Sequence, residues 1–229
     1  WDLLQLTSGL KKMRSSACSA SPLGTGRQSR RAVHGQSSQH RSLILHVHLP
    51  MLTLPQIETP RLFLRFLKVE DAADCHALET DPEVKQFLGG PSRKSVQFYR
   101  SQIAERAAGV STTLAVTLKK TGEFLGRCGF TEYREFVETV GWEINIVLGR
   151  QCPKKQGYAT EIGLALIRSG FDTLGCGTIL GVAETANIAS LKLCEKLGMK
   201  HKRDTVRNGR AARIYAIERH TYQMRSSTS

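Results

Sequence analysis

The 229-residue sequence lacks an apolar run that could cross a bilayer. Its longest apolar stretch, LILHVHLPMLTL from Leu43, contains two histidines and a proline. That stretch is also short, because a membrane-spanning helix needs about 20 consecutive apolar residues. We therefore expect a soluble protein with no membrane partner, located in the cytoplasm.

Paired cysteines are also missing. The six cysteines stand far apart, at positions 18, 75, 128, 152, 176 and 194, and no C-x-x-C pair occurs. This spacing indicates neither a zinc site nor a disulfide framework. The histidines have no partners at the spacing of metal ligands either. We expect reduced thiols and no metal.

Acidic residues are scarce in the first fifty positions, which hold one acid against seven basic residues and nine serines. This composition is typical of a transit peptide, which would imply import into an organelle. It is also typical of a translated upstream region, because Met51 directly precedes the first regular segment. The second reading is favoured, and both predict that residues 1–50 have no core of their own, being disordered or non-native. We expect a domain over residues 51–224 and a tail over 225–229.

The remaining sequence contains both strand and helix patterns. Helices are predicted over 70–81, 82–88, 92–108 with Ser92 as the cap, from Gly157 to about Phe171, and over NIASLKLCEKLG. In the fourth of these, Leu164, Ile167 and Phe171 lie along one face. Strands are predicted over TPRLFLRFL, STTLAVTLK, FLGRCGFTEY, VGWEINIVLG and TILGVAET, with two more joined at Asn208-Gly209.

The predicted order of these elements is strand, helices, three strands, helix, strand, helix and two strands. This order favours an α/β protein of the α+β kind. Its central sheet would be mixed and flanked by helices, with one β-α-β crossover in the second half.

The segment RQCPKKQGYATE combines features of an anion site at the start of a helix. Pro153 has no N–H and ends the strand, while Gly157 and the small Ala159 let a ligand approach the backbone. Unpaired N–H groups and the helix dipole attract anions there, and Lys154 and Lys155 add positive charge. The pattern predicts a pyrophosphate site. An ordinary helix start with solvated lysines is the alternative.

Four segments follow one another along the chain: TPRLFLRFLKVEDA, DPEVKQFL, GWEINIVLGRQCPKKQGYATE and ETANIASLKLCEKLGM. Together they resemble the GNAT superfamily of N-acetyltransferases, specifically the bacterial group that acetylates the N-termini of ribosomal proteins. With NGRAARIYAI, the resemblance covers nearly all of residues 52–224. It implies the GNAT fold, with a mostly antiparallel mixed sheet, and acetyl transfer from acetyl-CoA to an amine in one direct step.

The resemblance also implies how the cofactor binds. The family's loop reads Gln/Arg-x-x-Gly-x-Gly/Ala, and this sequence departs from it by placing lysine at the first position. The implied loop residues are Lys154, Lys155, Gln156, Gly157, Tyr158 and Ala159. Asn187, which is also a good helix N-cap, and Ser190 are implied to meet the cofactor arm. Main-chain N–H groups at Val147 and Gly149 are assigned to the thioester oxygen.

For the general base, the resemblance points to Glu143. Its neighbours Trp142 and Ile144 could raise its pKa, which would suit a base near neutral pH. The alternative is a strand glutamate that faces solvent or pairs with an arginine. Many family members carry a tyrosine that acts as the general acid. This sequence has Cys194 at that position. A buried helix cysteine is usually a small hydrophobe, so the acid remains unassigned.

The acceptor is left open between a protein N-terminus, including that of a ribosomal protein, and a small-molecule amine. The oligomeric state is equally open between monomer and homodimer. A non-catalytic domain that senses acyl-CoA with the same fold is the main alternative. A third possibility is an RNA-associated module, because residues 51–229 hold 26 basic residues against 19 acidic ones. No aromatic RNA-binding motif supports it.

Overall fold

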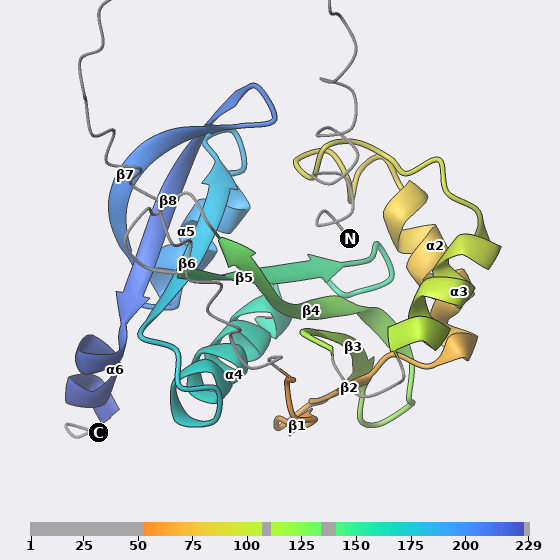
Figure 1. The fold of residues 1–229 in the computed structure, drawn as a ribbon, viewed down its shortest axis with the longest axis horizontal. Coiled ribbons are helices and arrows are strands. Elements are labelled where there is room, and N and C mark those ends of the chain that lie inside the picture. The colour runs from red at the N-terminus through yellow and green to blue at the C-terminus, as the bar shows by residue number, and fades with distance from the viewer. Residues whose placement is uncertain (1–52, 107–110, 134–140, 227–229) are drawn as a thin grey trace, which may run out of the picture. The chain divides into compact units, whose positions relative to one another are not determined.

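A computed structural model describes residues 53–106, 111–133 and 141–226, all within one compact unit. In these residues eight strands form a single mixed sheet with helices against it (Figure 1). None of the helices in the described ranges is long and apolar enough to span a membrane. The extension predicted over residues 1–50 lies outside the described part.

The strands are β1 Ile57–Glu58, β2 Leu62–Phe66, β3 Thr113–Leu118, β4 Phe124–Tyr133, β5 Gly141–Leu148, β6 Thr178–Glu184, β7 Lys200–Arg207 and β8 Arg210–Glu218. The helices are the 3-10 turn η1 Val69–Asp71, followed by α2 Ala72–Thr80, α3 Val96–Arg106, α4 Tyr158–Asp172, α5 Ile188–Lys196 and α6 Arg219–Ser226. The predicted order is confirmed, with β1 and α6 added to it.

Two predicted helices differ from the structure. Residues 82–88 form consecutive turns instead of a helix, because Pro82 begins the stretch and two left-handed glycines, Gly89 and Gly90, close it. The third helix begins at Val96, after Ser95, whose hydroxyl accepts a hydrogen bond from the Phe98 N–H at 3.3 Å. At the other end of the chain, α6 runs into the predicted tail.

The strand order is β1-β2-β3-β4-β5-β6-β8-β7, and α4 makes the predicted crossover between the parallel strands β5 and β6. β5 pairs with β4 along its whole length, from Gly141 to Leu148. It pairs with β6 only at Trp142–Ile179 and Glu143–Leu180. Beyond Glu143 the two parallel strands diverge, which leaves an opening in the sheet (Figure 1).

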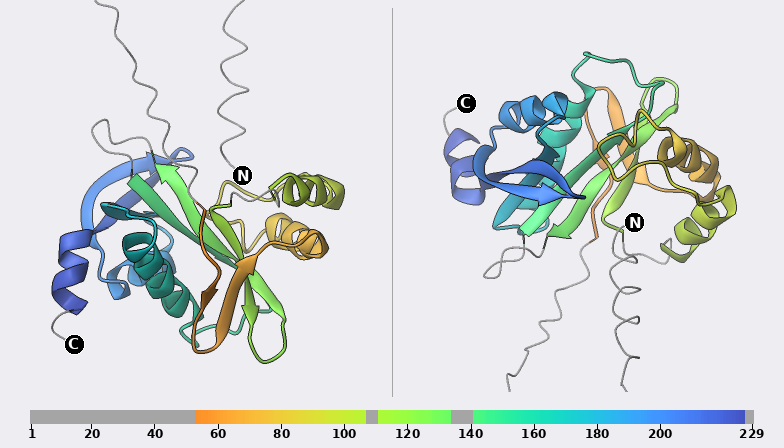
Figure 2. Two further views of the ribbon diagram at one scale, coloured as in Figure 1. Left: turned by 60° about the horizontal axis from the view of Figure 1, so that its bottom comes forward. Right: turned by 90° about the horizontal axis from the view of Figure 1, so that it is seen from above.

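Strand register decides which side chains share a face of the sheet, because successive residues point to opposite faces. Arg127 of β4 lies opposite Val147 of β5, and its guanidinium pairs with Glu79 of α2. The neighbouring residues Cys128 and Phe130 belong to the core beneath α4. We therefore name the two sides the α2 face and the α4 face (Figure 2).

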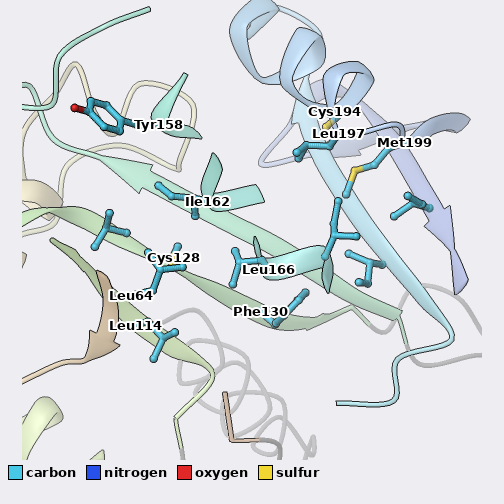
Figure 3. Packing of buried hydrophobic residues seen from close by; sticks show 14 of the residues in the cluster. Leu64, Leu114, Cys128, Phe130, Tyr158, Ile162, Leu166, Cys194, Leu197 and Met199 are labelled. Atoms are coloured by element: carbon cyan, nitrogen blue, oxygen red, sulfur yellow. The ribbon is translucent and has the colours of Figure 1, made fainter. Parts of the chain in front are cut away.

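The main core lies between the sheet and α4. Ile162 and Leu166 of α4 are fully buried and belong to one cluster with Cys128 and Phe130 of β4, as Figure 3 shows. The cluster continues to α5 through Cys194, Leu197 and Met199. Of the predicted α4 face, Ile167 and Phe171 are buried, but Leu164 is 52% exposed, so its placement on that face is wrong.

Candidate active site

A cavity of about 90 Å³ lies where β5 and β6 diverge. Glu143 lines it from the α2 face, and Ile144 and Ile146 line it from the α4 face. Its other lining residues are Phe87, Leu88, Gly181, Val182, Ala183, Glu184, Asn187, Ser190, Leu193, Cys194, Leu197, Met199 and Arg207. Because residues from both faces contribute, the cavity passes between the strands from one side of the sheet to the other.

The register of β4 and β5 determines which backbone N–H groups face this opening. The Gly149 N–H donates to the Leu125 carbonyl of the neighbouring strand at 2.8 Å. Hydrogen-bonded and non-bonded pairs alternate in an antiparallel ladder, so Val147 also directs its N–H toward β4. The thioester-oxygen role assigned to Val147 and Gly149 is therefore wrong. Ile144 and Ile146 direct their N–H groups away from β4, but that of Ile144 lies in the β5–β6 ladder beside Leu180, so the group that faces the opening belongs to Ile146.

The predicted anion loop lies at the start of α4. Lys154, Lys155 and Gln156 are exposed, and Lys155 and Gly157 both adopt left-handed backbone angles, with φ of 63° and 81°. A Cβ at Gly157 would meet no protein atom closer than 3.7 Å. The backbone angle, and not crowding within the protein, is what requires glycine at this position.

The N–H groups of Gly157, Tyr158 and Ala159 have no hydrogen-bond partner among the described residues. They include the first groups of α4, which have no partner inside the helix. Tyr158 contributes through its backbone alone, because its side chain is only 9% exposed and belongs to the core. The structure thus brings the predicted loop residues together as a cluster of unpaired donors.

The first turn of α5 borders the same cavity. Asn187 caps the helix as predicted, because its Oδ1 accepts a hydrogen bond from the Ser190 N–H at 3.1 Å. Both residues line the cavity, together with Cys194 one turn further along the helix. The five cysteines in the described ranges are all free and buried.

Glu143 is 3% exposed and forms an ion pair with Arg207, whose Nη1 lies 2.5 Å from its Oε1. The burial agrees with the predicted position between Trp142 and Ile144. The arginine partner was only the alternative in the sequence, and its guanidinium stabilises the ionised carboxylate. Glu143 is thus a buried carboxylate that is paired with an arginine and directed to the α2 side of the opening.

Phe87 and Leu88 come from the turns after α2, and a buried ion network holds those turns in place. Glu79 of α2 accepts hydrogen bonds from Lys85 of the turns, at 2.7 Å, and from Arg127 of β4. Burial alone would raise the pKa of Glu79, but the two cations lower it below its usual value. The network ties the turns to the sheet beside the cavity.

The hairpin between β7 and β8 contacts the same turns. Arg210 donates to the Gln86 carbonyl at 3.1 Å and pairs with the buried carboxylate of Glu184 at 3.2 Å. Glu143 and Glu184 therefore each pair with an arginine of this hairpin on the α2 face. Sequence reasoning did not place Phe87, Glu184 and both arginines at the site, since contacts between distant segments bring them together.

The protein-family model described as "Acetyltransferase (GNAT) domain" matches residues 61–200 of this chain. A curated relative, the uncharacterized protein YkkB of Bacillus subtilis, is 30% identical over 171 residues. That match covers 73% of this chain and 96% of the relative.

Solved structures show the same fold. An acetyltransferase of the GNAT family from Bacillus anthracis matches with a TM-score of 0.62 and 21% identity, covering 72% of this chain and 99% of that one. The spermidine N-acetyltransferase of Vibrio cholerae, solved with CoA and spermine, matches with a TM-score of 0.58 and 18% identity. That second match covers 71% of this chain and 98% of the other.

Proposed function

Because this chain belongs to the GNAT family of acetyltransferases, we propose that it moves the acetyl group of acetyl-CoA directly to a primary amine. One observation carries the proposal. The opening between β5 and β6 is bordered by the first turn of α5 on its α4 side and by a buried carboxylate paired with an arginine on its α2 side, and the start of α4 carries unpaired backbone donors. A negatively charged acyl donor and a basic acceptor would need these two environments.

On the α4 side, the N–H groups from Gln156 to Ala159 would hold the pyrophosphate of acetyl-CoA, with Lys154 and Lys155 adding charge. Asn187 and Ser190 would contact the cofactor arm, since both line the cavity. The acetyl thioester would lie in the cavity, and the nucleotide would remain outside it, beside the start of α4. A coenzyme A-bound neighbour of the same fold supports this cosubstrate.

In the reaction, the amine nitrogen attacks the thioester carbonyl carbon. A C–N bond forms, the C–S bond breaks, and coenzyme A leaves as a thiolate. Glu143 would take the amine's proton, directly or through a water molecule. The N–H of Ile146 would stabilise the charge that develops on the thioester oxygen.

Cys194 does not suit the acid step. Burial raises its pKa to about 11, and the charge of Glu143 adds to this effect. An ordinary thiol has a pKa of about 8.5, so proton transfer from Cys194 to the coenzyme A thiolate would run uphill by about 3 kcal/mol. We therefore assign the proton on the leaving thiol to water and treat Cys194 as a packing residue.

The acceptor would approach from the α2 face. Glu143 and Glu184 lie buried there, and each would have to exchange its arginine partner for an amine that arrives as a cation. We propose a primary amine, either a protein N-terminus, including that of a ribosomal protein, or a small molecule. The match to a spermidine enzyme adds polyamines to the amines that should be tested.

Release of free thiol from acetyl-CoA in the presence of different amines tests the proposal. The panel includes spermidine, an aminoglycoside and short peptides with free N-termini, each compared with its N-blocked form. We expect thiol release that depends on both the protein and a free amine. Binding of coenzyme A without turnover on any amine would instead favour a sensor. Absence of both would contradict the proposed function.

A further inference from the structure

Arg61 lies in the turn between β1 and β2 and reaches the start of α4. Its Nη1 donates to the Gln156 carbonyl at 2.9 Å, and its Nε donates to Glu161 at 2.7 Å. The guanidinium carbon also lies 4.3 Å from the centre of the Tyr158 ring. The Arg61 side chain thus contacts a residue before α4, the first residue of α4 and a residue in its first turn.

Glu161 is held from the same turn by two more hydrogen bonds. The Thr59 hydroxyl donates to its carboxylate at 2.7 Å, and the Arg61 backbone N–H donates at 2.9 Å. Burial tends to raise the pKa of Glu161, but these hydrogen bonds lower it below its usual value. A negative charge therefore stands in the first turn of α4, and Arg61 neutralises it beside the loop assigned to the pyrophosphate.

Arg61 also fixes the orientation of a backbone unit in that loop. The carbonyl and the N–H of a trans peptide point in opposite directions, so holding the Gln156 carbonyl sets the direction of the Gly157 N–H. Lys155 and Gly157 on either side both adopt left-handed angles. Few residues adopt such angles without outside support, and Arg61 supplies a contact from a distant part of the chain.

The arginine contributes little to the stability of the fold. Its side chain is 42% exposed, and ion pairs at this level of exposure are largely screened by water. Its contacts are the Gln156 carbonyl of the loop, the Glu161 carboxylate and the Tyr158 ring. Building on the proposed function, we propose that Arg61 is a positioning residue for the pyrophosphate of acetyl-CoA. It orients the Gln156–Gly157 peptide and neutralises Glu161.

Calorimetric titration of the full chain with coenzyme A tests this proposal. Arg61→Ala should weaken binding at least tenfold. Arg61→Lys should also weaken it clearly, because lysine keeps the charge but lacks the planar fork that contacts several groups at once. The matched control is Arg168→Ala on the same helix, where the side chain is 79% exposed and pairs only with Asp172. Its affinity should equal that of the wild type.

A truncated donor separates positioning from a general structural effect. Acetyl-pantetheine lacks the pyrophosphate, so Arg61→Ala should raise the KM for acetyl-CoA and leave kcat and the KM for acetyl-pantetheine unchanged. Equal losses with both donors, or wild-type affinity in Arg61→Lys, would overturn the proposal. If the wild type itself fails to bind coenzyme A, the proposed function fails before this inference does. Should Arg61→Ala not fold, Arg61→Lys decides by the same criteria.

Discussion

The two sides of the opening between β5 and β6 use different chemistry. On the α4 face, exposed backbone N–H groups at the start of a helix form the candidate donor site. On the α2 face, buried carboxylates paired with arginines form the candidate acceptor site. The difference indicates which kind of substitution should impair each side. The donor side should depend on backbone shape and tolerate lost charges, whereas the acceptor side should depend on single side-chain charges.

The largest effect is expected on the acceptor side. Glu143→Gln should lower kcat at least about 100-fold, because a positioned base contributes about that much or more. The loss should be greatest below the pKa of the acceptor amine, where a proton must be removed. Coenzyme A affinity should stay unchanged. Steady-state kinetics over a pH range, together with calorimetry, checks both expectations.

Glu105→Gln, at an exposed position on α3, is the matched control and should keep wild-type turnover. If Glu143→Gln turned over normally across the pH range, Glu143 would be a structural partner of Arg207 and the base would lie elsewhere.

The next effect is expected on the donor side. Gly157→Val should weaken coenzyme A binding about 100-fold, because valine disfavours the left-handed backbone angle and its side chain would crowd the anion. Gly175→Val is the control for strain alone. Gly175 follows α4, has φ of 70° and no atom within 4 Å of a Cβ, so valine there should leave the affinity unchanged. Equal affinities for both variants would make the loop an ordinary helix start.

A smaller loss is expected at Asn187, which joins the cap of α5 to the cavity. Asn187→Ala should lower the free energy of unfolding by about 1 kcal/mol through the lost cap. It should also weaken coenzyme A binding about three- to tenfold. Asn187→Ser keeps a capping side chain, so it should restore stability without restoring affinity. Thermal unfolding and calorimetry on both variants check this. If Asn187→Ser regained wild-type affinity, the role of Asn187 would be limited to capping α5.

The smallest losses are expected for the two lysines of the loop. Lys154→Ala and Lys155→Ala each remove an exposed charge, which should cost about 1 kcal/mol or less, or about fivefold in affinity. The cost should shrink further as salt is added, because exposed charges are screened. Titration at two ionic strengths checks both points. If a lysine variant bound coenzyme A more weakly than Gly157→Val does, charge would matter more than backbone shape on the donor side.

The sequence predicted the parts of the site that depend on local geometry. Gly157 and Asn187 mark helix starts through their own backbone and side-chain preferences, and such preferences act over a few residues. The order of the elements along the chain and the α4 crossover followed from patterns of the same short range. For this reason most of the fold and most of the donor loop could be predicted.

Long-range register could not be predicted. A shift of one residue between β4 and β5 reverses which N–H groups face the opening, and the observed register directs those of Val147 and Gly149 toward β4. Pairing of Glu143 with Arg207 depends on a hairpin 64 residues away. The helix α6 was missed because its sequence, RHTYQMRS, has too few apolar residues to show a period.

One measurement tests the division of the site most directly: coenzyme A titrated into the wild type, Glu143→Gln and Gly157→Val under identical conditions. We predict that the wild type and Glu143→Gln bind with equal affinity, while Gly157→Val loses at least about 100-fold, the loss expected when a side chain enters the cradle for the anion. Equal binding by all three proteins, or a loss confined to Glu143→Gln, would contradict the assignment of the donor to the α4 face.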